Sequence, residues 1–286
     1  MAKAGVYDIS GSDYHADPCE VPSLSASIVK IIWEKSPLHA WLAHPKLNPD
    51  YEPDNKRQFD LGTAAHAVFL ERSEDKLFVL GADDYRKKAT QEARDKAYED
   101  GLIPILERER GDVRAMASTA TRYIDETELA GIFQNGKAEQ TLIANYEGAK
   151  LRSRLDWLTD DRLVILDHKT GKFSSKPENW INRQLFKMNY DIQAYMYLLM
   201  NELTGGPSNA KFIFLVQENI KPFACSLIGA GPSVLESGKK KFRYALHKWK
   251  WCLEFNKWPA YDTKIAWADV PPWEMAKIEE REVYDE

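Results

Sequence analysis

Three strand-like segments follow one another between residues 138 and 170. Alternating or branched apolar residues fill three runs, 138–147, 149–159 and 162–170. Gly148 separates the first two runs, and Asp160-Asp161 separates the second from the third. Turn residues between such runs predict hairpin connections. We therefore expect an antiparallel meander, which excludes a fold built only from strand–helix–strand crossovers.

Helical patterns and two more strands continue the fold after the meander. A long helix is predicted over 178–205, and Gly205-Gly206-Pro207 marks its end. Strands at 210–218 and 223–229 and a helix at 233–256 come next. This order predicts an α/β (α+β) protein with a mixed central sheet of about five strands flanked by helices.

The chain of 286 residues suits one elaborated domain. Residues 1–22 are polar and turn-rich, a first helix is capped by Ser25 or Ser27, and a second helix is predicted over 61–73. Residues 83–130 have a helical pattern, interrupted by Gly101 and Pro104. The parts of this domain are an N-terminal arm and helix (1–58), a histidine-bearing helix (59–82), a helical insertion (83–135), the sheet with its helix (136–230), and a C-terminal helix with a tryptophan-rich tail (231–286).

Charge and cysteine usage narrow the class of protein. A net charge of −5 argues against a generally basic nucleic-acid binder, so contact with a polyanion would depend on local patches or bound metal. The three widely spaced cysteines, without a CxxC pair, favour a reducing compartment. No run approaches the roughly 18 apolar residues that a membrane span requires. These features predict a cytoplasmic protein with no membrane attachment.

The hairpin formed by 149–159 and 162–170 places chemistry-bearing residues on one face. If Asp160 and Asp161 form a two-residue turn, Asp156 pairs with Ile165, and Arg154 pairs with Asp167. Residues two apart in a strand share a face, so Asp156, Asp167 and Lys169 project from the same side of the sheet. This inference depends on the loop length, because a slip of one residue reverses the faces.

Two neighbouring carboxylates and a lysine suit a hydrolytic metal site. Carboxylates that lie close together repel unless a cation or a proton compensates, and a hard divalent ion with oxygen ligands does so. Lys169 would then stand beside the metal, where it could orient or help to deprotonate a water and stabilise charge on a phosphoryl oxygen. The alternative is an exposed salt-bridge cluster at a sheet edge, Arg154–Asp167 and Asp156–Lys169.

Further motifs accompany this hairpin in a defined order. They are "GTAAHAVFLE" with His66, "KAEQTL" with Glu139, "SRLDWL" with Asp156, "ILDHKTG" with Asp167, His168 and Lys169, and "DIQAYMYLL" with Gln193 and Tyr197. Over roughly residues 23–273 this series resembles the PD-(D/E)xK nuclease superfamily. Within it, the series is similar to the phage-type exonucleases related to the C-terminal nuclease of RecE (exonuclease VIII). The resemblance implies a restriction-endonuclease-like αβββαβ core.

The resemblance also implies roles for individual residues. His66, Asp156 and Asp167 would bind metal, the backbone carbonyl of His168 would be a further ligand, and Glu139 would complete the acidic cluster. The expected cofactor is Mg²⁺ or Mn²⁺, with one or two ions per site. The implied catalytic residues are Lys169, Asp156, Asp167, Glu139, Gln193 and Tyr197. Without the resemblance, His66 would be interpreted as a satisfied histidine on an alanine-rich helix.

Gln193 and Tyr197 lie four residues apart in the predicted helix and so share one face. From that face they could contact the lysine of the metal site or the DNA backbone. Tyr197 belongs to the aromatic run "YMYLL", for which core packing is the more usual role.

Basic residues gather in two segments, 152–187 and 237–251, despite the negative net charge. Residues 237–251 contain six Lys or Arg and no acid, interleaved with aromatic residues, which suits contact with a DNA backbone or with unpaired bases. A solvated helix face is the alternative. The candidate DNA-contacting residues are Arg154, Lys172, Lys239, Lys240, Lys241 and Arg243. By analogy with lambda-type exonucleases, Ser27 is a candidate for holding a 5′-phosphate, with helix capping as its alternative role.

These observations lead to a single hypothesis with two alternatives. The chain is expected to be a metal-dependent exonuclease that degrades linear double-stranded DNA, 5′ to 3′ by family analogy, and leaves a 3′ strand for recombination. The resemblance implies a bacterial or phage-infected cell, a ring-shaped homo-oligomer and a single-strand annealing protein as a partner. The alternatives are an endonuclease or repair nuclease of the same superfamily, and a non-catalytic DNA-binding recombination protein.

Overall fold

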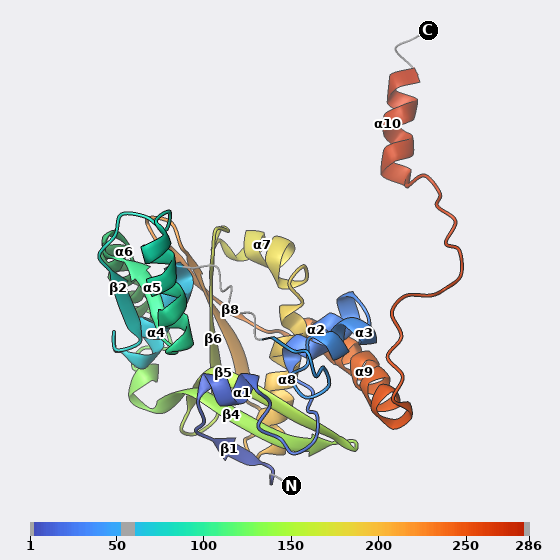
Figure 1. Cartoon of the computed structure of the whole chain (residues 1–286), viewed down its shortest axis with the longest axis horizontal. Helices are drawn as coiled ribbons and strands as arrows, with labels where there is room; N and C mark the ends of the chain where they lie inside the picture. Colours follow the sequence, from blue (N-terminus) through green and yellow to red (C-terminus); the bar gives the residue numbers. More distant parts are fainter. Residues whose placement is uncertain (1–2, 53–60, 283–286) are drawn as a thin grey trace.

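The computed structural model describes residues 3–52 and 61–282 and has a mixed β-sheet at its centre (Figure 1). The strands lie in the order β1 (Gly5–Tyr7), β4 (Gly136–Tyr146), β5 (Ala149–Thr159), β6 (Val164–Gly171), β7 (Lys211–Glu218) and β8 (Cys225–Gly229). β6 and β7 are parallel, and the other neighbours are antiparallel. The predicted mixed sheet flanked by helices is confirmed. It has six strands instead of about five, because the N-terminal segment adds β1 to the edge of β4.

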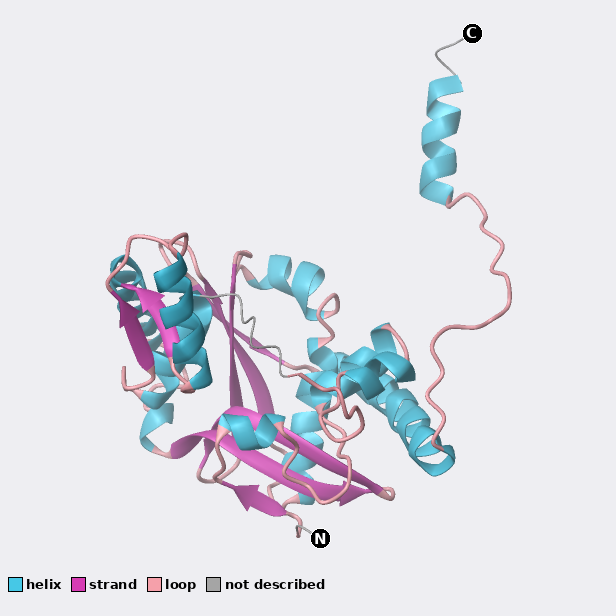
Figure 2. Ribbon diagram, viewed as in Figure 1, coloured by secondary structure: helices cyan, strands magenta, loops and turns pink. Residues whose placement is uncertain are grey.

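Helices cover both faces of this sheet (Figure 2). The larger core lies between the sheet and α2 (Ala26–Glu34), α3 (Pro37–Leu42), α8 (Tyr190–Leu203) and α9 (Pro232–Phe255). The other face packs against α4 (Leu61–Glu71) and α6 (Glu107–Asp125). Strand β7 shows how the sequence serves both faces: Phe214 and Val216 enter the larger core, and Leu215 between them enters the other. This alternation is the period of two that a strand imposes on its side chains.

Two short strands before the meander were not predicted, one in the histidine-bearing segment (59–82) and one in the insertion (83–135). β2 (Leu77–Leu80) and β3 (Ile103–Leu106) pair in parallel, and α5 (Lys88–Glu99) lies between them in the sequence. Gly101, with φ of +74°, follows the end of α5, and the apolar run "IPIL" then pairs with β2. The prediction of a helical segment interrupted at Gly101 and Pro104 was therefore wrong for β3, because Pro104 lies in a short strand of a two-stranded sheet.

The loop between β5 and β6 is longer than predicted. β5 ends at Thr159, β6 begins at Val164, and the ladder pairs Trp157 with Leu166 and Leu158 with Ile165. The predicted two-residue turn, with Asp156 opposite Ile165 and Arg154 opposite Asp167, was wrong by two residues in register. A shift of two residues keeps every side chain on its predicted face. Asp156 and Asp167 therefore still share one side of the sheet.

The helix predicted over 178–205 is interrupted. It consists of α7 (Pro177–Trp180), a π-helical turn (Ile181–Leu185) and α8, which begins after Asn189. Asn189 adopts a left-handed conformation with φ of +48°, which asparagine tolerates better than most residues. Its amide donates to Oε1 of Glu34 at 2.6 Å and accepts from Nζ of Lys241 at 2.6 Å. Tertiary hydrogen bonds therefore fix the break, and local periodicity does not reveal them.

A buried polar network ties the N-terminal segment to β5. The carboxylate of Asp17, which is 2% exposed, accepts from the backbone and hydroxyl of Ser23 at 2.8 and 2.7 Å. The same carboxylate lies 3.1 Å from a guanidinium nitrogen of Arg152 and 3.3 Å from Nε2 of His44. Leu24 adds a backbone bridge to Leu151. The short helix α1 (Gly11–His15) precedes this network, which covers one end of the sheet.

Close packing of α8 on α9 depends on Gly238. A Cβ atom at this position would collide with the backbone oxygen of Asp191. We expect Gly238→Ala to lower the free energy of unfolding by about 1–3 kcal/mol or more, because the clash is with backbone and the two helices must separate. Gly111→Ala in α6 is the matched control, because a Cβ atom there would have no neighbour within 4 Å, and alanine favours helix by about 1 kcal/mol. Urea unfolding of both variants measures this. Equal stability of the two variants would contradict the expectation.

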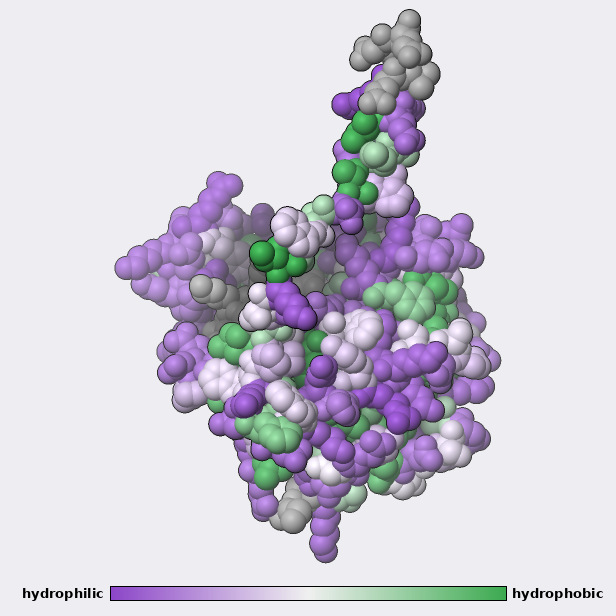
Figure 3. Space-filling view, turned by 90° about the vertical axis from the view of Figure 1, so that its right-hand side faces the viewer, coloured by the Kyte–Doolittle hydropathy of each residue, from purple (hydrophilic) through white to green (hydrophobic). Residues whose placement is uncertain are grey.

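The C-terminal residues form an arm that leaves the body of the protein. Trp258 still packs edge-on against Trp249, with ring centres 5.5 Å apart. Beyond it, the chain extends to α10 (Pro272–Glu282), which lies away from the sheet in Figure 1. Apolar side chains (green) lie along this arm in Figure 3, and Trp267 is 86% exposed. Within residues 3–52 and 61–282, no helix combines the length and apolar character needed to cross a membrane.

Candidate metal centre

A histidine and two carboxylates from three elements meet at one side of the sheet. Nε2 of His66 in α4 lies 3.4 Å from Oε1 of Glu139 in β4. Nδ1 of His66 lies 3.8 Å from Oδ2 of Asp156 in β5. Each residue offers one ligand atom, and these atoms all lie within 4.8 Å of one another. Their side chains are 25%, 26% and 18% exposed, so the cluster is partly open to solvent.

Glu139 has an unusual backbone conformation at this cluster. Its φ is +56°, a region that a residue other than glycine occupies at some energetic cost. The neighbouring residues Ala138 and Gln140 pair regularly with β5, so the ladder is interrupted at Glu139. Nε of Arg154 donates to Oε2 of Glu139 at 2.6 Å and fixes the carboxylate. The same guanidinium donates to the backbone oxygen of Ile9 at 2.8 Å, so the N-terminal segment supports the cluster.

Asp167 is fully buried beside the cluster and is held by two protein groups. Nε2 of Gln193 donates to Oδ1 of Asp167 at 2.6 Å. Nζ of Lys169 lies 2.5 Å from Oδ2. Of the predicted metal-binding residues, His66, Asp156 and Glu139 form the three-residue cluster. Asp167 lies beside the cluster and binds Lys169 and Gln193, and its predicted role as a metal ligand, like that of the His168 carbonyl, stays a prediction. The salt bridges considered as an alternative, Arg154–Asp167 and Asp156–Lys169, are not the pairs that form, because Arg154 binds Glu139 and Lys169 binds Asp167.

The electrostatics of the cluster show an excess of negative charge. Burial and then the charge of Asp167 raise the pKa of Asp156 to about 7. Burial opposes ionisation of Glu139, but His66 and Arg154 lower its pKa to about 2. Burial lowers the pKa of His66, yet the charges of Asp156 and Glu139 raise it overall. One imidazole nitrogen and two carboxylates are common donors to divalent metal ions in proteins. The donor set therefore fits a metal ion, which would also compensate the repulsion.

His168 points to the opposite face from Asp167, as the alternation of the strand predicts. Its Nε2 lies 3.0 Å from Oε1 of Gln217, and its ring stacks on that of His66, with centres 5.4 Å apart. Its backbone N–H donates to Oδ2 of Asp156 at 2.8 Å. Burial and the charge of His66 hold the pKa of His168 well below its ordinary value. The His168 ring is therefore a neutral support beneath His66.

The two helical candidates have different surroundings. Gln193 contacts Asp167 directly, as described above. Tyr197, one turn later, is 8% exposed and packs edge-on against Phe212 in the larger core, and its side chain also interacts with that of Gln193. A residue that the sequence patterns did not single out, Tyr190, lies nearer to the lysine: Nζ of Lys169 is 4.8 Å from its ring centre. Tyr190 is the first residue of α8 after the unpredicted break, which is why its position could not be inferred.

The predicted DNA-contacting residues are distributed over different surfaces. Exposed side chains are those of Ser27, Lys172, Lys239, Lys240 and Arg243. Ser27 lies in the first turn of α2, whose N-cap is Ser25. Lys241 is largely enclosed, with Nζ 2.8 Å from Oδ2 of Asp191. Arg154 is also turned inward, onto Glu139.

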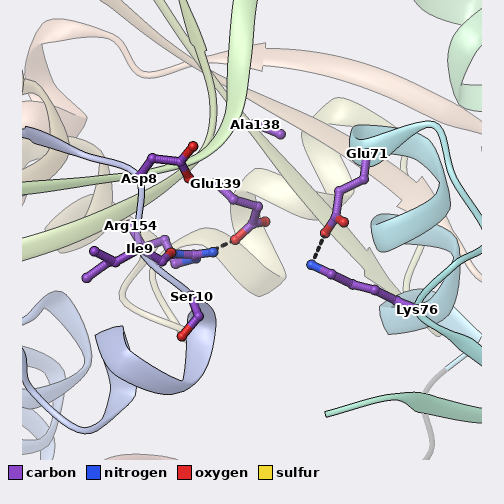
Figure 4. A pocket seen from close by; sticks show the side chains of 8 residues that line it. All are labelled: Asp8, Ile9, Ser10, Glu71, Lys76, Ala138, Glu139 and Arg154. Atoms are coloured by element: carbon purple, nitrogen blue, oxygen red, sulfur yellow. Dashed lines mark hydrogen bonds and ion pairs between the residues drawn. The ribbon is translucent and has the colours of Figure 1, made fainter.

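Two recesses are described, and one of them includes Glu139 of the cluster. One, of about 480 Å³, is lined by Glu139, Arg154, Lys76 and Glu71 among others (Figure 4). In that view Arg154 reaches Glu139 on one wall, and the ion pair of Glu71 and Lys76 forms the facing wall. The second, of about 220 Å³, is lined by Lys172, Phe173, Ser174, Asn179, Arg183 and Gln184. Both recesses thus carry basic side chains.

Comparisons with known proteins place the chain in context. Residues 25–269 match the model of a family described as "PDDEXK-like domain of unknown function (DUF3799)". A crystal structure of a protein from Eubacterium rectale, described provisionally as an exonuclease, is 13% identical, covers 94% of this chain and 98% of its own, and has a TM-score of 0.58. The structure of SSO0001 is also 13% identical, covers 65% of this chain and 88% of its own, and has a TM-score of only 0.27. The comparison with curated proteins found no match.

Proposed function

Because the chain belongs to the family of PDDEXK-like domains, we propose that it is a metal-dependent nuclease that hydrolyses phosphodiester bonds of DNA. The observation that carries this proposal is the cluster of His66, Glu139 and Asp156 beside the buried pair of Asp167 and Lys169. A metal-binding group next to a fixed ammonium ion suits attack of water on a phosphodiester, where negative charge develops on phosphoryl oxygens.

The residues of this chain have distinct tasks in such a reaction. His66, Glu139 and Asp156 would hold a divalent cation, which supplies an activated water and polarises the phosphate when bound. Lys169 stabilises negative charge on the phosphate. Burial would lower its pKa, but Asp167 and Asp156 raise it overall, which favours the ammonium form. Gln193 fixes Asp167, and Asp167 in turn orients Lys169.

The finer proposal is an exonuclease that acts on linear duplex DNA, with Mg²⁺ or Mn²⁺ as its cofactor. The fold similarity to a protein described provisionally as an exonuclease supports it. Digestion 5′ to 3′, production of a 3′ strand for recombination, assembly into a homo-oligomeric ring and cooperation with an annealing protein belong to the same proposal. They rest on the resemblance of the motifs.

Linear duplexes labelled at either end test this proposal directly. With Mg²⁺ or Mn²⁺ we expect release of nucleotides from the linear duplex, and no cutting of a covalently closed circle. EDTA should abolish the release, because the cluster without a cation provides neither activated water nor charge compensation. At 100 times its dissociation constant, the cation should also stabilise the folded protein by about 2.7 kcal/mol. Cutting of the closed circle would indicate an endonuclease, and full activity in EDTA would refute the metal site.

A further inference from the structure

A second lysine lies beside Lys169 and has no part in the function described above. Lys30, in α2, places its Nζ 4.7 Å from the centre of the Tyr190 ring. Lys169, from β6, places its Nζ 4.8 Å from the centre of the same ring. Two ammonium groups from different elements therefore meet at one aromatic side chain.

The surroundings of Tyr190 bring these two groups together. Trp180 lies parallel to the Tyr190 ring, with centres 5.6 Å apart and 5° between the planes, so it covers one face. Among the charges that act on Lys30, that of Lys169 is the strongest: burial and then this ammonium lower the pKa of Lys30 to about 8. Two like charges in a partly buried place are unfavourable unless an anion lies between them.

Asp167 compensates the charge of Lys169, but none of the described carboxylates forms an ion pair with Lys30. Three carboxylates act on Lys30 through their charge, those of Asp167, Glu34 and Asp191. All three already bind other polar groups of the protein, at distances between 2.5 and 2.8 Å. Among the residues that the structure describes, Lys30 has neither an ion pair nor a hydrogen bond. Its ammonium therefore has no charged or hydrogen-bonding partner among these residues, and the side chain is only partly buried.

We propose that Lys30 is a substrate-binding residue that holds the scissile phosphate together with Lys169, each ammonium at one nonbridging oxygen. The identity of the ligand as a DNA phosphodiester rests on the proposed function. The position of the phosphate is inferred from the contacts around Tyr190. A phosphate between the two lysines relieves their repulsion and accepts charge-assisted hydrogen bonds from both. Because the two lysines come from α2 and β6, they also fix the orientation of the phosphate relative to Asp167.

A binding experiment separates this role from catalysis. The experiment titrates three proteins with short duplexes in Ca²⁺: wild type, Lys30→Met and the control Lys35→Met. Lys35 is an exposed lysine of the same region. Gels verify that the DNA stays intact. In each duplex one phosphate is replaced by a neutral methylphosphonate. For wild type and Lys35→Met, a methylphosphonate at one position of the duplex should lower the affinity for DNA about tenfold, the equivalent of about 1.4 kcal/mol. Lys30→Met should bind unmodified DNA about tenfold more weakly and lose clearly less than wild type at that position. Lys30→Arg should restore the wild-type pattern in part.

The outcomes distinguish this inference from the proposed function. If Lys30→Met shows the wild-type pattern at every position, or if wild type shows no position-specific loss, Lys30 does not hold a phosphate. Thermal unfolding is followed in parallel, and Lys30→Gln carries the same test if Lys30→Met does not fold. If wild type cuts no DNA, the proposed function is wrong, but the conclusion from the binding pattern is unaffected. A Lys30→Met variant with wild-type binding refutes the inference and leaves cleavage as it is.

Discussion

Asp167→Asn is expected to reduce hydrolysis of linear duplex DNA by at least about 100-fold while the protein stays folded. Removing one group that stabilises charge in a transition state costs about that much or more. Asparagine has the shape of aspartate but lacks the charge that holds Nζ of Lys169 at 2.5 Å, so the ammonium loses its orientation. Acid-soluble nucleotide release in Mg²⁺ or Mn²⁺ measures the effect.

The control for Asp167→Asn is a change of the same kind on the same hairpin. Asp160→Asn lies in the exposed loop between β5 and β6 and should leave the rate unchanged. Lys169→Met should resemble Asp167→Asn, because both remove the same ammonium from the phosphate. If Asp167→Asn degrades DNA at the wild-type rate, the assignment of this pair to catalysis is wrong.

Asp17→Asn is expected to have the largest effect on stability. The carboxylate is buried and bound by Ser23, Arg152 and His44, so the change leaves the charge of Arg152 buried without its partner. Breaking a buried ion pair in this way costs about 3–5 kcal/mol. Urea unfolding at neutral pH measures the loss, and Asp50→Asn, on the exposed surface of the same N-terminal segment, serves as the control.

The same network gives a pH dependence with a definite sign. Burial would raise the pKa of Asp17, but the hydrogen bond with His44 and the charge of Arg152 hold it well below its ordinary value. A depressed pKa in the folded protein contributes stability that is fully present above the unfolded value of about 4 and is lost as the pH falls below it. The stability of wild type should therefore fall more steeply below pH 4 than that of Asp17→Asn. Parallel curves would show that Asp17 ionises normally.

Segments with a strong local pattern could be predicted from the sequence. β5 has the predicted limits of 149–159, since alternation is regular there and Gly148 marks its start. β1 could not be predicted, because three residues show no period and only pairing with β4 makes them a strand. The break before α8 depends on Glu34 and Lys241, which are distant in the chain from Asn189.

For the site, the sequence predicts the face of the sheet on which the residues lie, but not their side-chain contacts. Asp156, Asp167 and Lys169 share a side because the error in register was even. The left-handed conformation of Glu139 has no sequence signature. The aromatic run around Tyr197 did indicate core packing, but not that its neighbour is Phe212. The contact of Lys30 with Tyr190 could not be predicted either, because the position of Tyr190 depends on the tertiary break before α8.

Arg154 links residues that are far apart in the chain, and this has a consequence for how the protein is made. The guanidinium joins Glu139 to the backbone of Ile9, and Gln193 is needed to hold Asp167. Contacts between residues so distant in sequence form late in folding, because chain closure has to precede them. A chain still emerging from the ribosome, or trapped in a partly folded state, therefore lacks an assembled site. Assembly of the site is in this way coupled to completed folding.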